Sequence, residues 1–521
     1  MEVRHRYPIG IQDFETLRMG GYLYIDKSGL IWKMTHSDYP YVFLSRPRRF
    51  GKSLLTSALR CYFEGRKDLF RGLAIEKLEE EWKEYPVLHF DMSMGKHLDK
   101  DALERTLLYQ IGSNEKRLGL QGEGTDTNVR FTKLIENASL SAGKKVVILI
   151  DEYDSPLLDV MHEEEELPLL RKVMTNFYSP LKATGKYIHF CFFTGITKFS
   201  QLSIFSALNN IANISMDPSY AAICGISKEE LLTQMSEDID TLASQLKLSR
   251  EKAIDKLVEY YDGYHFSSPS PDIFNPYSLI NAFCFKNIRP YWFDTGTPTF
   301  LVNMLRKYEV LPSQVGDKTE IALSGFDTPT ERMTSATPLL YQSGYLTIKE
   351  YDGELLSFTL DIPNKEIRLG LMESLLPEYI QLPPERGMTN VIRMYKALRT
   401  GDMDGTLRQL QTYLGTIPYT SCTGGEGHWQ QVLYIIFSLM GVYVDVEVRT
   451  PKGRVDVVMR TALALYIIEL KMNQSAEAAM KQIELKDYPS RFALCGLPVV
   501  KVGVNFDGQK HNITDWTIEG A

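Results

Sequence analysis

The sequence predicts an α/β protein with a parallel sheet in its N-terminal part, a mostly helical middle region and a second α/β block at its C-terminal end. Between residues 41 and 205, short apolar runs alternate with segments long enough for helical crossovers, which is the pattern of a parallel sheet. From about residue 217, helical stretches mix with aromatic-rich loops such as YYDGYHF. From about residue 426, strand-like runs return.

Length and composition indicate the number of domains and the class of protein. A chain of 521 residues is too long for one hydrophobic core, and 44% hydrophobic with 24% charged residues is typical of a globular protein. We predict four segments: a sheet domain over residues 1–215, a mostly helical region appended to it over 216–364, a helical connector over 365–420, and an α/β domain over 421–521.

The net charge and the cysteines indicate which binding partners and which cellular compartment are to be expected. The net charge of −8 argues against non-specific coating of a nucleic acid, although it leaves room for a local basic groove. Six scattered cysteines without a C-x-x-C pair indicate reduced thiols. The chain does not open on an apolar signal core, and it lacks the run of about eighteen apolar residues that a membrane span needs. We therefore expect a cytoplasmic protein that does not enter a membrane.

The stretch RPRRFGKS, residues 46–53, ends as a phosphate-binding loop does. Such a loop reads G-x-x-x-x-G-K-[ST], so Gly51, Lys52 and Ser53 fit, while Arg46 stands where the first glycine is expected. The apolar run YVFLS before it supplies a strand, and SLLTSALRCYFEG after it supplies a helix. We predict that Lys52 reaches the phosphates of ATP and that Ser53 ligates Mg²⁺.

The first half of this loop departs from the usual pattern. Pro47 fixes φ and lacks an N–H, so the usual first turn cannot form. Three arginines, Arg46, Arg48 and Arg49, are expected to compensate, because guanidinium groups bind phosphate well. Phosphate binding is the favoured interpretation over a basic surface turn, and hydrolysis of the nucleotide is left open.

The run VVILIDE has the form of a Walker B strand. Five apolar residues would deliver Asp151 to the Mg²⁺ at the carboxyl edge of the sheet, and Glu152 would orient or deprotonate the attacking water. A buried strand ending in two solvated acids is the weaker alternative, because a strand, loop and helix ending in GKS precede it. A third strand ends in Thr194, which could sense the γ-phosphate, although an ordinary polar strand end is favoured.

Several blocks of the sequence together resemble one known family. The blocks are YPIGIQDFETLRMGGYLYIDKSGLI, RPRRFGKSLLTSALRCYFEG, VVILIDEYDSPL, FFTGITKFSQLSIFSALNNI and YYDGYHF. They resemble the bacterial AAA-ATPase-like family, whose members usually carry a C-terminal PD-(D/E)XK nuclease-like domain. The resemblance implies a P-loop NTPase domain followed by a restriction-endonuclease-like α/β domain. It also implies that Arg46 is a typical feature of the loop, and it supplies no substrate.

The C-terminal stretch GRVDVVMRTALALYIIELK, residues 453–471, predicts a β-hairpin. If its turn centres between Ala462 and Leu463, Asp456 lies directly opposite Glu469. Glu469 and Lys471 are two residues apart and therefore point to the same face. The hairpin would thus collect two carboxylates and one ammonium.

This spacing, D-x₁₂-E-x-K, matches the PD-(D/E)XK nuclease pattern. Asp456 and Glu469 would hold Mg²⁺ or Mn²⁺, and Lys471 would stabilise the developing charge or position the nucleophile. Two facing acids repel one another without a cation, which favours a metal site over a surface charge cluster. A degenerate nuclease that binds without cutting is a third interpretation.

Other residues near this hairpin are open to two interpretations. Glu426, at the start of an apolar helix over residues 427–441, either joins the metal site or favours the helix dipole. Gln482 and Tyr488 resemble a Q-x-x-x-Y-type element, with two residues too many between them. For His428, the position of a packed core or surface histidine is favoured over contact with substrate. For YYDGYHF, core packing of a loop is favoured over stacking on a base.

The expected function combines the predicted ATP site with the predicted nuclease site. We predict that binding of ATP, with or without hydrolysis, controls a metal-dependent nuclease that acts on nucleic acid, with DNA favoured over RNA. The alternative is an ATP-dependent binding or signalling protein whose inactive nuclease fold is a recognition platform. Formation of a homo-oligomer is left open.

Overall fold

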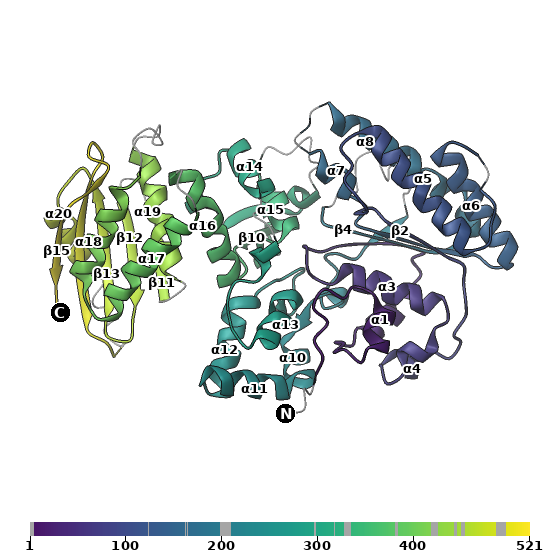
Figure 1. Cartoon of the computed structure of the whole chain (residues 1–521), viewed down its shortest axis with the longest axis horizontal. Helices are drawn as coiled ribbons and strands as arrows, with labels where there is room; N and C mark the ends of the chain where they lie inside the picture. Colours follow the sequence, from purple (N-terminus) through teal and green to yellow (C-terminus); the bar gives the residue numbers. More distant parts are fainter. Residues whose placement is uncertain are drawn as a thin grey trace. The chain divides into compact units, whose positions relative to one another are not determined.

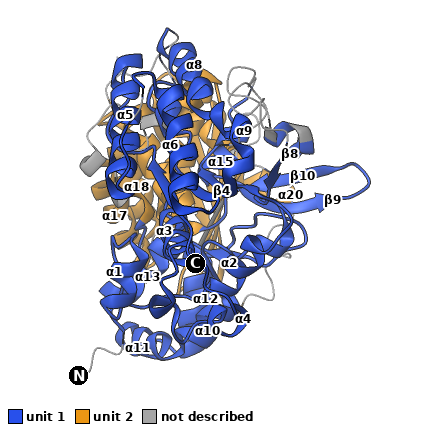
Figure 2. Ribbon diagram, turned by 90° about the vertical axis from the view of Figure 1, so that its right-hand side faces the viewer, with its two compact units in different colours: residues 1–291, 318–364 blue, residues 292–317, 365–521 orange. Residues whose placement is uncertain are grey.

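The computed structural model describes residues 5–122, 124–161, 163, 165–197, 210–295, 299–316, 318–327, 335–380, 384–417, 426–441, 445–449, 454–485 and 496–520. They form two compact units, shown in Figure 2: unit 1 contains residues 1–291 and 318–364, and unit 2 contains residues 292–317 and 365–521. The chain therefore passes from one unit to the other three times. Most of the region predicted over 216–364 folds together with the N-terminal sheet domain, and the connector predicted over 365–420 folds with the C-terminal domain.

The centre of unit 1 is a parallel sheet of five strands in the order β2–β3–β4–β1–β5. The strands are β1 (Tyr41–Ser45), β2 (Val87–Asp91), β3 (Val146–Asp151), β4 (Ile188–Gly195) and β5 (Ile211–Asn213). The first four follow the apolar runs that predict a sheet, and β1 and β3 are buried along their whole length. Since β4 separates β1 from β3, the loop after β1 and the end of β3 lie about 10 Å apart at the same edge.

Helices cover both faces of this sheet (Figure 1). On one face lie α5 (Lys100–Arg117), α6 (Thr127–Ala142) and α8 (Glu166–Tyr178), which pack against one another. The other face carries α1 (Phe14–Met19), α3 (Lys52–Phe63) and α4 (Ile75–Leu78). This is the layer arrangement in which a parallel sheet buries both of its apolar faces.

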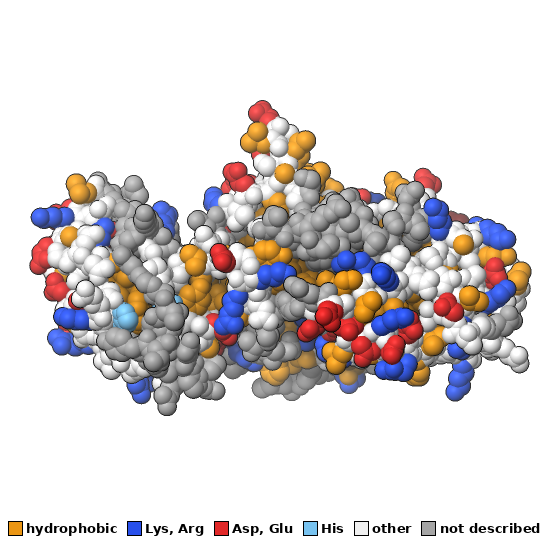
Figure 3. All heavy atoms as spheres, turned by 90° about the horizontal axis from the view of Figure 1, so that it is seen from above, with side chains coloured by type: hydrophobic (Ala, Val, Ile, Leu, Met, Phe, Trp, Pro, Cys, Tyr) orange, Lys and Arg blue, Asp and Glu red, His pale blue; other side chains and the backbone are white. Residues whose placement is uncertain are grey.

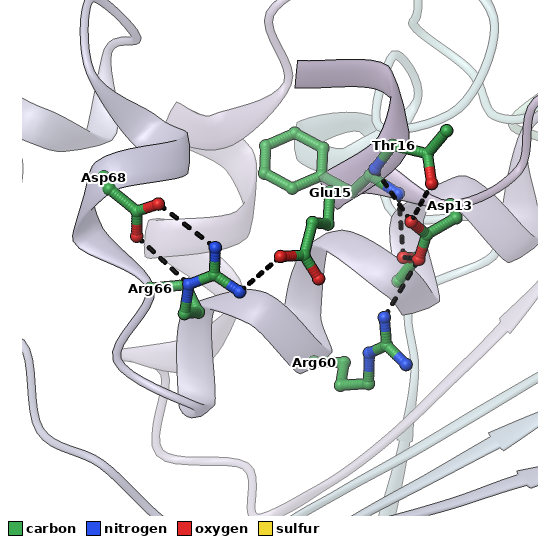
Figure 4. Close-up of polar contacts among 8 residues, drawn as sticks. Asp13, Glu15, Thr16, Arg60, Arg66 and Asp68 are labelled. Carbon is green, nitrogen blue, oxygen red and sulfur yellow. Dashed lines mark hydrogen bonds and ion pairs between the residues drawn. The ribbon is translucent and has the colours of Figure 1, made fainter. Parts of the chain in front are cut away.

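Polar contacts hold α1 against α3, as Figure 4 shows. Asp13 caps α1 with one carboxylate oxygen, and its other oxygen accepts hydrogen bonds from Ser57 Oγ at 3.1 Å and Arg60 Nη2 at 2.9 Å, both on α3. A second set of ion pairs near the far end of α3 joins Arg66 to Glu15 and to Asp68. These pairs are partly exposed, so they set the position of α1 more than they add stability.

The rest of unit 1 is mostly helical, as predicted, with two small sheets that the sequence pattern does not indicate. Its helices include α10 (Lys228–Gln234), α11 (Ser236–Leu246), α12 (Arg250–Tyr261), α13 (Pro276–Phe285) and α15 (Thr337–Ser343). One sheet pairs β6 (Ile226–Ser227) with β7 (Ile273–Phe274). The other has the antiparallel order β8–β10–β9 and contains β8 (Thr319–Ala322), β9 (Thr347–Asp352) and β10 (Ser357–Asp361).

Unit 2 is built on a five-stranded sheet in the order β11–β12–β13–β14–β15. Its strands are β11 (Asp445–Arg449), β12 (Arg454–Arg460), β13 (Leu465–Met472), β14 (Val499–Asp507) and β15 (Asn512–Glu519). Only the β13–β14 pair is parallel. The outer strand next to β14 is β15, which pairs with it in antiparallel orientation.

Unit 2 has helices on both faces of its sheet. The described helices of this unit are α14 (Thr299–Lys307), α16 (Lys365–Ile380), α17 (Pro384–Arg399), α18 (Met403–Leu414), α19 (Glu426–Met440) and α20 (Ala476–Leu485). On one face α20 packs Met480 and Ile483 against Ile467 of β13. On the other face Trp429 of α19 lies 5.4 Å from the ring of Phe506 of β14. The helical connector predicted over 365–420 corresponds to α16, α17 and α18.

Candidate functional site

The loop between β1 and α3 contains two residues in the left-handed region. Arg49 has φ 69°, and Gly51, at the N-cap of α3, has φ 90°. Glycine adopts this conformation without strain, which accounts for Gly51 directly before the helix. The first turn of α3 follows at once, so its free N–H groups and its positive dipole end lie at this loop.

Lys52 lies inside the curve of the loop. Its side chain is buried, and its Nζ donates hydrogen bonds to the carbonyl oxygens of Arg46 and Pro47 at 3.1 and 3.2 Å. These neutral acceptors are weaker partners for an ammonium than phosphate oxygens would be. The ammonium is thus held where a phosphate in the loop would meet it.

Arg46 does not have the role that the sequence predicts for it. Its side chain is only 2% exposed, and its guanidinium donates to the carbonyl oxygens of Ser45 at 2.9 Å, Ser215 at 2.8 Å and Tyr220 at 3.2 Å. It also lies 4.1 Å from the centre of the Phe266 ring. Because these groups occupy the guanidinium, Arg46 fixes the loop to the protein interior and is not placed to contact phosphate.

The two following arginines remain exposed. Arg48 and Arg49 both reach solvent, and the guanidinium of Arg49 lies 4.8 Å from the centre of the Tyr277 ring. Of the three arginines expected to compensate for the missing glycine, these two are accessible to a nucleotide.

The carboxyl edge of the sheet gathers acids beside the loop. Asp151 ends β3 and is 5% exposed, and the hydroxyl of Ser53 lies beside its carboxylate. Burial raises the pKa of Asp151 to about 6, against the effects of Ser53 and Lys52, and with the added repulsion of Glu152 and Asp91. Oxygen ligands of this kind suit Mg²⁺, which would relieve that repulsion.

Asp91 is a residue of this edge that the sequence analysis missed. It ends β2 and is the direct partner of Asp151 in the parallel ladder. Its carboxylate accepts hydrogen bonds from the N–H and the hydroxyl of Ser93, at 2.9 and 2.6 Å. The sequence does contain a pattern that could have identified Asp91, because Asp91 ends an apolar run just as Asp151 does.

The residues after Asp151 divide into two roles. Glu152 has φ 48°, a conformation that glutamate rarely adopts outside constrained turns. Asp154 is fully buried and accepts hydrogen bonds from the N–H groups of Ile196 and Thr197, at 3.1 and 2.6 Å. Asp151 and Glu152 therefore lie at the carboxyl edge of the sheet, beside the loop. Asp154 instead holds this turn against the residues that directly follow β4.

Thr194 lies near the end of β4, between β1 and β3. Its side chain is fully buried, and its Oγ1 makes no hydrogen bond with any group in the described part of the chain. Its hydroxyl is therefore available between the loop and the acidic edge.

The second half of unit 1 packs directly on the loop. The ring of Phe50 lies 4.7 Å from Tyr264 and 5.4 Å from Phe266, both in edge-on geometry. The N–H of Gly225 donates to the carbonyl of Phe50 at 3.1 Å. Tyr264 is 1% and Phe266 5% exposed, so the block YYDGYHF packs in the core, as favoured from the sequence, and its rings are not open to a base.

In unit 2, β12 and β13 form the predicted hairpin. Arg460 pairs with Leu465, which leaves residues 461–464 for the turn, and Asp456 is the direct partner of Glu469. Glu469 is fully buried, while Asp456 and Lys471 are each 8% exposed. Lys471 Nζ lies 3.1 Å from Glu469 Oε1. The two carboxylates and the ammonium therefore lie together on one face.

The line of cross-strand partners through Asp456 and Glu469 continues into the strands on either side. It adds two residues that could not be predicted by counting along the β12–β13 hairpin. Arg449 of β11 pairs with Asp456, and Gly503 of β14 pairs with Glu469. A Cβ on Gly503 would lie 2.5 Å from the carbonyl oxygen of Ala476, so only glycine lets the first turn of α20 approach this closely. The acidic pair is thus flanked by an arginine on one side and the start of a helix on the other.

Asp456 and Glu469 fit a divalent cation, because adjacent carboxylates are favourable only with positive charge between them. Within the described residues, no group of three or more His, Cys, Asp or Glu side chains is placed to hold a metal ion. Water or phosphate oxygens would have to complete the coordination. The side chain of Glu426 and the whole of Tyr488, both predicted near this site, lie outside the described part of the structure.

The remaining candidates of unit 2 are placed as follows. His428 is half-buried and stacks on Tyr379 with ring centres 5.6 Å apart, and burial lowers its pKa. Its ring therefore packs against another aromatic side chain. Gln482 is half-buried on α20. In the parts of the chain that the structure describes, no helix is long and apolar enough to cross a membrane.

Comparison with known proteins gives matches at both ends of the chain. Residues 8–205 match the family described as predicted AAA-ATPase, and residues 424–516 match the PD-(D/E)XK nuclease superfamily. Over 528 aligned positions, which cover 99% of each chain, the sequence is 31% identical to an uncharacterized protein in the vnfD 5′ region of Azotobacter chroococcum mcd 1. That alignment runs through both matched regions.

Proposed function

Because this chain belongs to the predicted AAA-ATPase family and carries a C-terminal PD-(D/E)XK nuclease-superfamily domain, we propose that it binds ATP and that the bound nucleotide controls cleavage of nucleic acid. The observation that carries the proposal is the presence of two separate clusters of charged side chains, one in each unit. Lys52, Ser53 and Asp151 meet at one edge of the unit 1 sheet, and Asp456 meets Glu469 in unit 2.

In unit 1 we assign each residue a role toward ATP. Lys52 exchanges its two carbonyl acceptors for β- and γ-phosphate oxygens, and Arg48 and Arg49 approach the same phosphates from the exposed side. Ser53 and Asp151 would hold Mg²⁺, which neutralises phosphate charge when bound. Glu152 orients the attacking water if the nucleotide is hydrolysed.

A mainly apolar hollow next to Gly51 suits the base of the nucleotide. Its lining comprises Pro8, Leu23, Tyr24, Ile25, Lys27, Phe50, Gly51, Leu54, Leu55, Ile223, Cys224, Gly225, Ile226, Pro276 and Ile280. The charge of Lys27 is balanced there by Glu230, whose two carboxylate oxygens both lie 2.6 Å from its Nζ. Apolar walls with few polar groups are typical of sites that take a planar ring.

In unit 2 the proposed reaction is metal-dependent hydrolysis of a phosphodiester. Asp456 and Glu469 would hold Mg²⁺ or Mn²⁺, which polarises the phosphate and lowers the pKa of a bound water. Lys471 donates to the attacking water or to the oxygen that gains charge, and leaves its present partner Glu469 to the metal. Arg449, exposed at the end of the same row, binds a neighbouring phosphate of the substrate.

We propose DNA as the preferred substrate and RNA as the alternative. Over the face seen in Figure 3, Lys and Arg side chains lie among Asp and Glu side chains, in keeping with the net charge of −8. A nucleic acid would therefore be held by a few local contacts, such as those of Arg449 and Lys471, and not by a broad basic surface.

Cleavage of labelled single- and double-stranded DNA and RNA by the full chain tests the proposal. We expect cutting with Mg²⁺ or Mn²⁺, loss of at least 100-fold in rate in Glu469→Gln, and a changed ATP response in Lys52→Ala. The matched control is Glu484→Gln, which removes an exposed carboxylate on α20 and is expected to cut at the normal rate. An ATP-independent rate in both the normal chain and Lys52→Ala would overturn control by the nucleotide.

A second candidate function is an ATP-dependent binding protein whose nuclease-like domain recognises nucleic acid without cutting it. It is favoured by the existing ion pair of Lys471 with Glu469 and by the lack of a third carboxylate ligand within the described residues. Isothermal titration with Mn²⁺ separates the two candidates, because a platform needs no metal at Asp456. Absence of Mn²⁺ binding, together with intact binding of DNA, would favour the platform.

A further inference from the structure

We infer that unit 1 has a second ligand site, a cavity that binds an alkylammonium group in addition to the nucleotide site. The cavity has a volume of about 470 Å³, within the usual range for small-molecule sites. Its lining comprises Trp32, Thr35, His36, Tyr62, Phe63, Leu78, Glu79, Glu80, Glu81, Lys83, Tyr85 and His189. None of these residues belongs to the nucleotide site or to the nuclease-like site described above.

The cavity lies at the opposite edge of the sheet from the phosphate-binding loop. Tyr85 lies two residues before β2, and His189 lies at the beginning of β4, whereas the nucleotide site is at the carboxyl ends of these strands. Tyr62 and Phe63 end α3, the helix that starts at Lys52. A helix of 12 residues is about 18 Å long, so the two sites are separate pockets joined by one rigid element.

Aromatic rings form much of the wall and are held in place by stacking. Trp32 stacks on His36 with ring centres 4.5 Å apart, and Tyr85 stacks on His189 at 4.2 Å with an angle of only 3° between the rings. Tyr62 supplies a further ring and is itself buried. The faces of electron-rich rings attract organic cations, most strongly where water is partly excluded.

The charge of the lining favours a cation over an anion. Glu79 is only 9% exposed, and its carboxylate is fixed by the hydroxyl of Tyr62, by the N–H of Glu81 at 2.9 Å, and by His36 Nε2 at 3.4 Å. Glu80 is exposed, and Glu81 is paired with Lys83. Three carboxylates face one ammonium, so the acidic side chains of the lining outnumber its lysine.

His189 does not change this preference. Burial lowers the pKa of His189, and the positive charges of Lys145, Lys83 and His36 lower it further. His189 is therefore neutral at pH 7 and does not repel a cation. The described residues include no set of three His, Cys, Asp or Glu side chains placed to hold a metal ion, so the aromatic and acidic lining suits an organic amine better than a metal.

Two sources present an alkylammonium group: a free polyamine, or the lysine side chain of a peptide. The test uses isothermal titration of the full chain with spermidine and, separately, with the dipeptide glycyl-lysine amide, at constant ionic strength. We expect saturable one-to-one binding of at least one of them. Tighter binding of spermidine assigns the site to free polyamines, and tighter binding of the dipeptide assigns it to lysine side chains.

Three variants locate the binding. Glu80→Gln removes an exposed carboxylate of the lining, and Tyr85→Leu removes one ring face, so we expect each to weaken binding about tenfold. Glu104→Gln, on α5 outside the cavity, is the matched control and should bind as the normal chain does. Equal affinity in all three variants, absence of saturable binding, or the same heat from Mg²⁺ at equal ionic strength would overturn the inference. The titration requires neither ATP nor cleavage, so its outcome is independent of the proposed function.

Discussion

At the scale of single residues, Arg46 explains how the loop keeps its shape without its first glycine. In the usual loop that glycine allows a tight turn. Here the turn is held from outside, because the buried guanidinium binds the carbonyl oxygens of Ser215 and Tyr220. These acceptors lie 169 and 174 positions further along the chain. No local pattern could reveal them, which is why the sequence suggests a phosphate contact instead.

We predict that Arg46→Met destabilises unit 1 by about 2 kcal/mol or more, because buried carbonyls lose charged hydrogen-bond donors. Arg48→Met is the matched control, since Arg48 is exposed and its loss should leave stability unchanged. The control is instead expected to weaken ATP binding about tenfold. Thermal unfolding and titration with a fluorescent ATP analogue measure both effects. Equal stability of the two variants would contradict the structural role of Arg46.

The acidic pair of unit 2 gives a second prediction at this scale. Asp456→Asn removes one of two facing carboxylates and leaves the pair of Lys471 with Glu469 intact. We expect an unfolding temperature in EDTA that is unchanged or slightly raised, because a repulsion is lost.

Mn²⁺ distinguishes a metal site from a structural pair. The normal chain should gain about 2.7 kcal/mol when Mn²⁺ is present at 100 times its dissociation constant, and Asp456→Asn should gain nothing. Asp515→Asn, which alters an exposed acid on β15, should behave like the normal chain. A full Mn²⁺ response in Asp456→Asn would place the metal elsewhere.

At the scale of elements, local register was predictable and distant pairing was not. The turn of the β12–β13 hairpin is short, so counting from its centre places Asp456 opposite Glu469. Arg449 belongs to the same row, but no count along the chain fixes the register of β11 with β12. The first four strands of the unit 1 sheet could likewise be predicted from their apolar runs, whereas their order in the sheet depends on contacts between distant segments.

The end of α12 offers a prediction on pH. Burial raises the pKa of Asp262 from an ordinary 3.8 to about 6, with repulsion from Asp272, against a hydrogen bond from Gly263. Between these two values the folded state holds a proton that the unfolded state has released. Its contribution to stability is therefore present below about pH 4 and is lost as the pH rises to about 6.

Asp262→Asn should abolish this loss of folding stability with rising pH, because an amide does not titrate. A shift of about two pH units corresponds to about 3 kcal/mol, part of which the burial of an amide offsets. We expect the variant to be about 2 kcal/mol more stable than the normal chain at pH 7.5 and equal to it at pH 4, measured by urea unfolding. Asp272→Asn should act in the opposite direction, because a hydrogen bond to His265 lowers the pKa of Asp272. An advantage of Asp262→Asn that is independent of pH would contradict the explanation.

At the scale of the whole molecule, the chain connects the two units through a segment that touches the nucleotide loop. Residues 318–364 belong to unit 1, but at both ends they continue into unit 2. Within this segment, α15 ends at Gly344, which lies against Pro47 of the loop. A change of the loop on binding ATP would thus act on a segment whose two ends are anchored in the unit that carries the nuclease-like site.

Gly344→Ala tests this route. Gly344 has φ 89°, and a Cβ there would lie 2.7 Å from Cβ of Pro47, so the substitution strains the turn and pushes on the loop. The metal site of unit 2 is untouched. We therefore expect metal-dependent cleavage without ATP to be unchanged, while the response of the cleavage rate to ATP falls by about half or more.

The matched control is Gly353→Ala, in the turn between β9 and β10, where a Cβ would meet only the Tyr351 ring at an ordinary 3.7 Å. It should keep the full response to ATP. If Gly344→Ala also keeps that response while ATP still binds, the nucleotide signal does not pass through residues 318–364, and the other passage between the units, at residues 291 and 292, becomes the segment to alter.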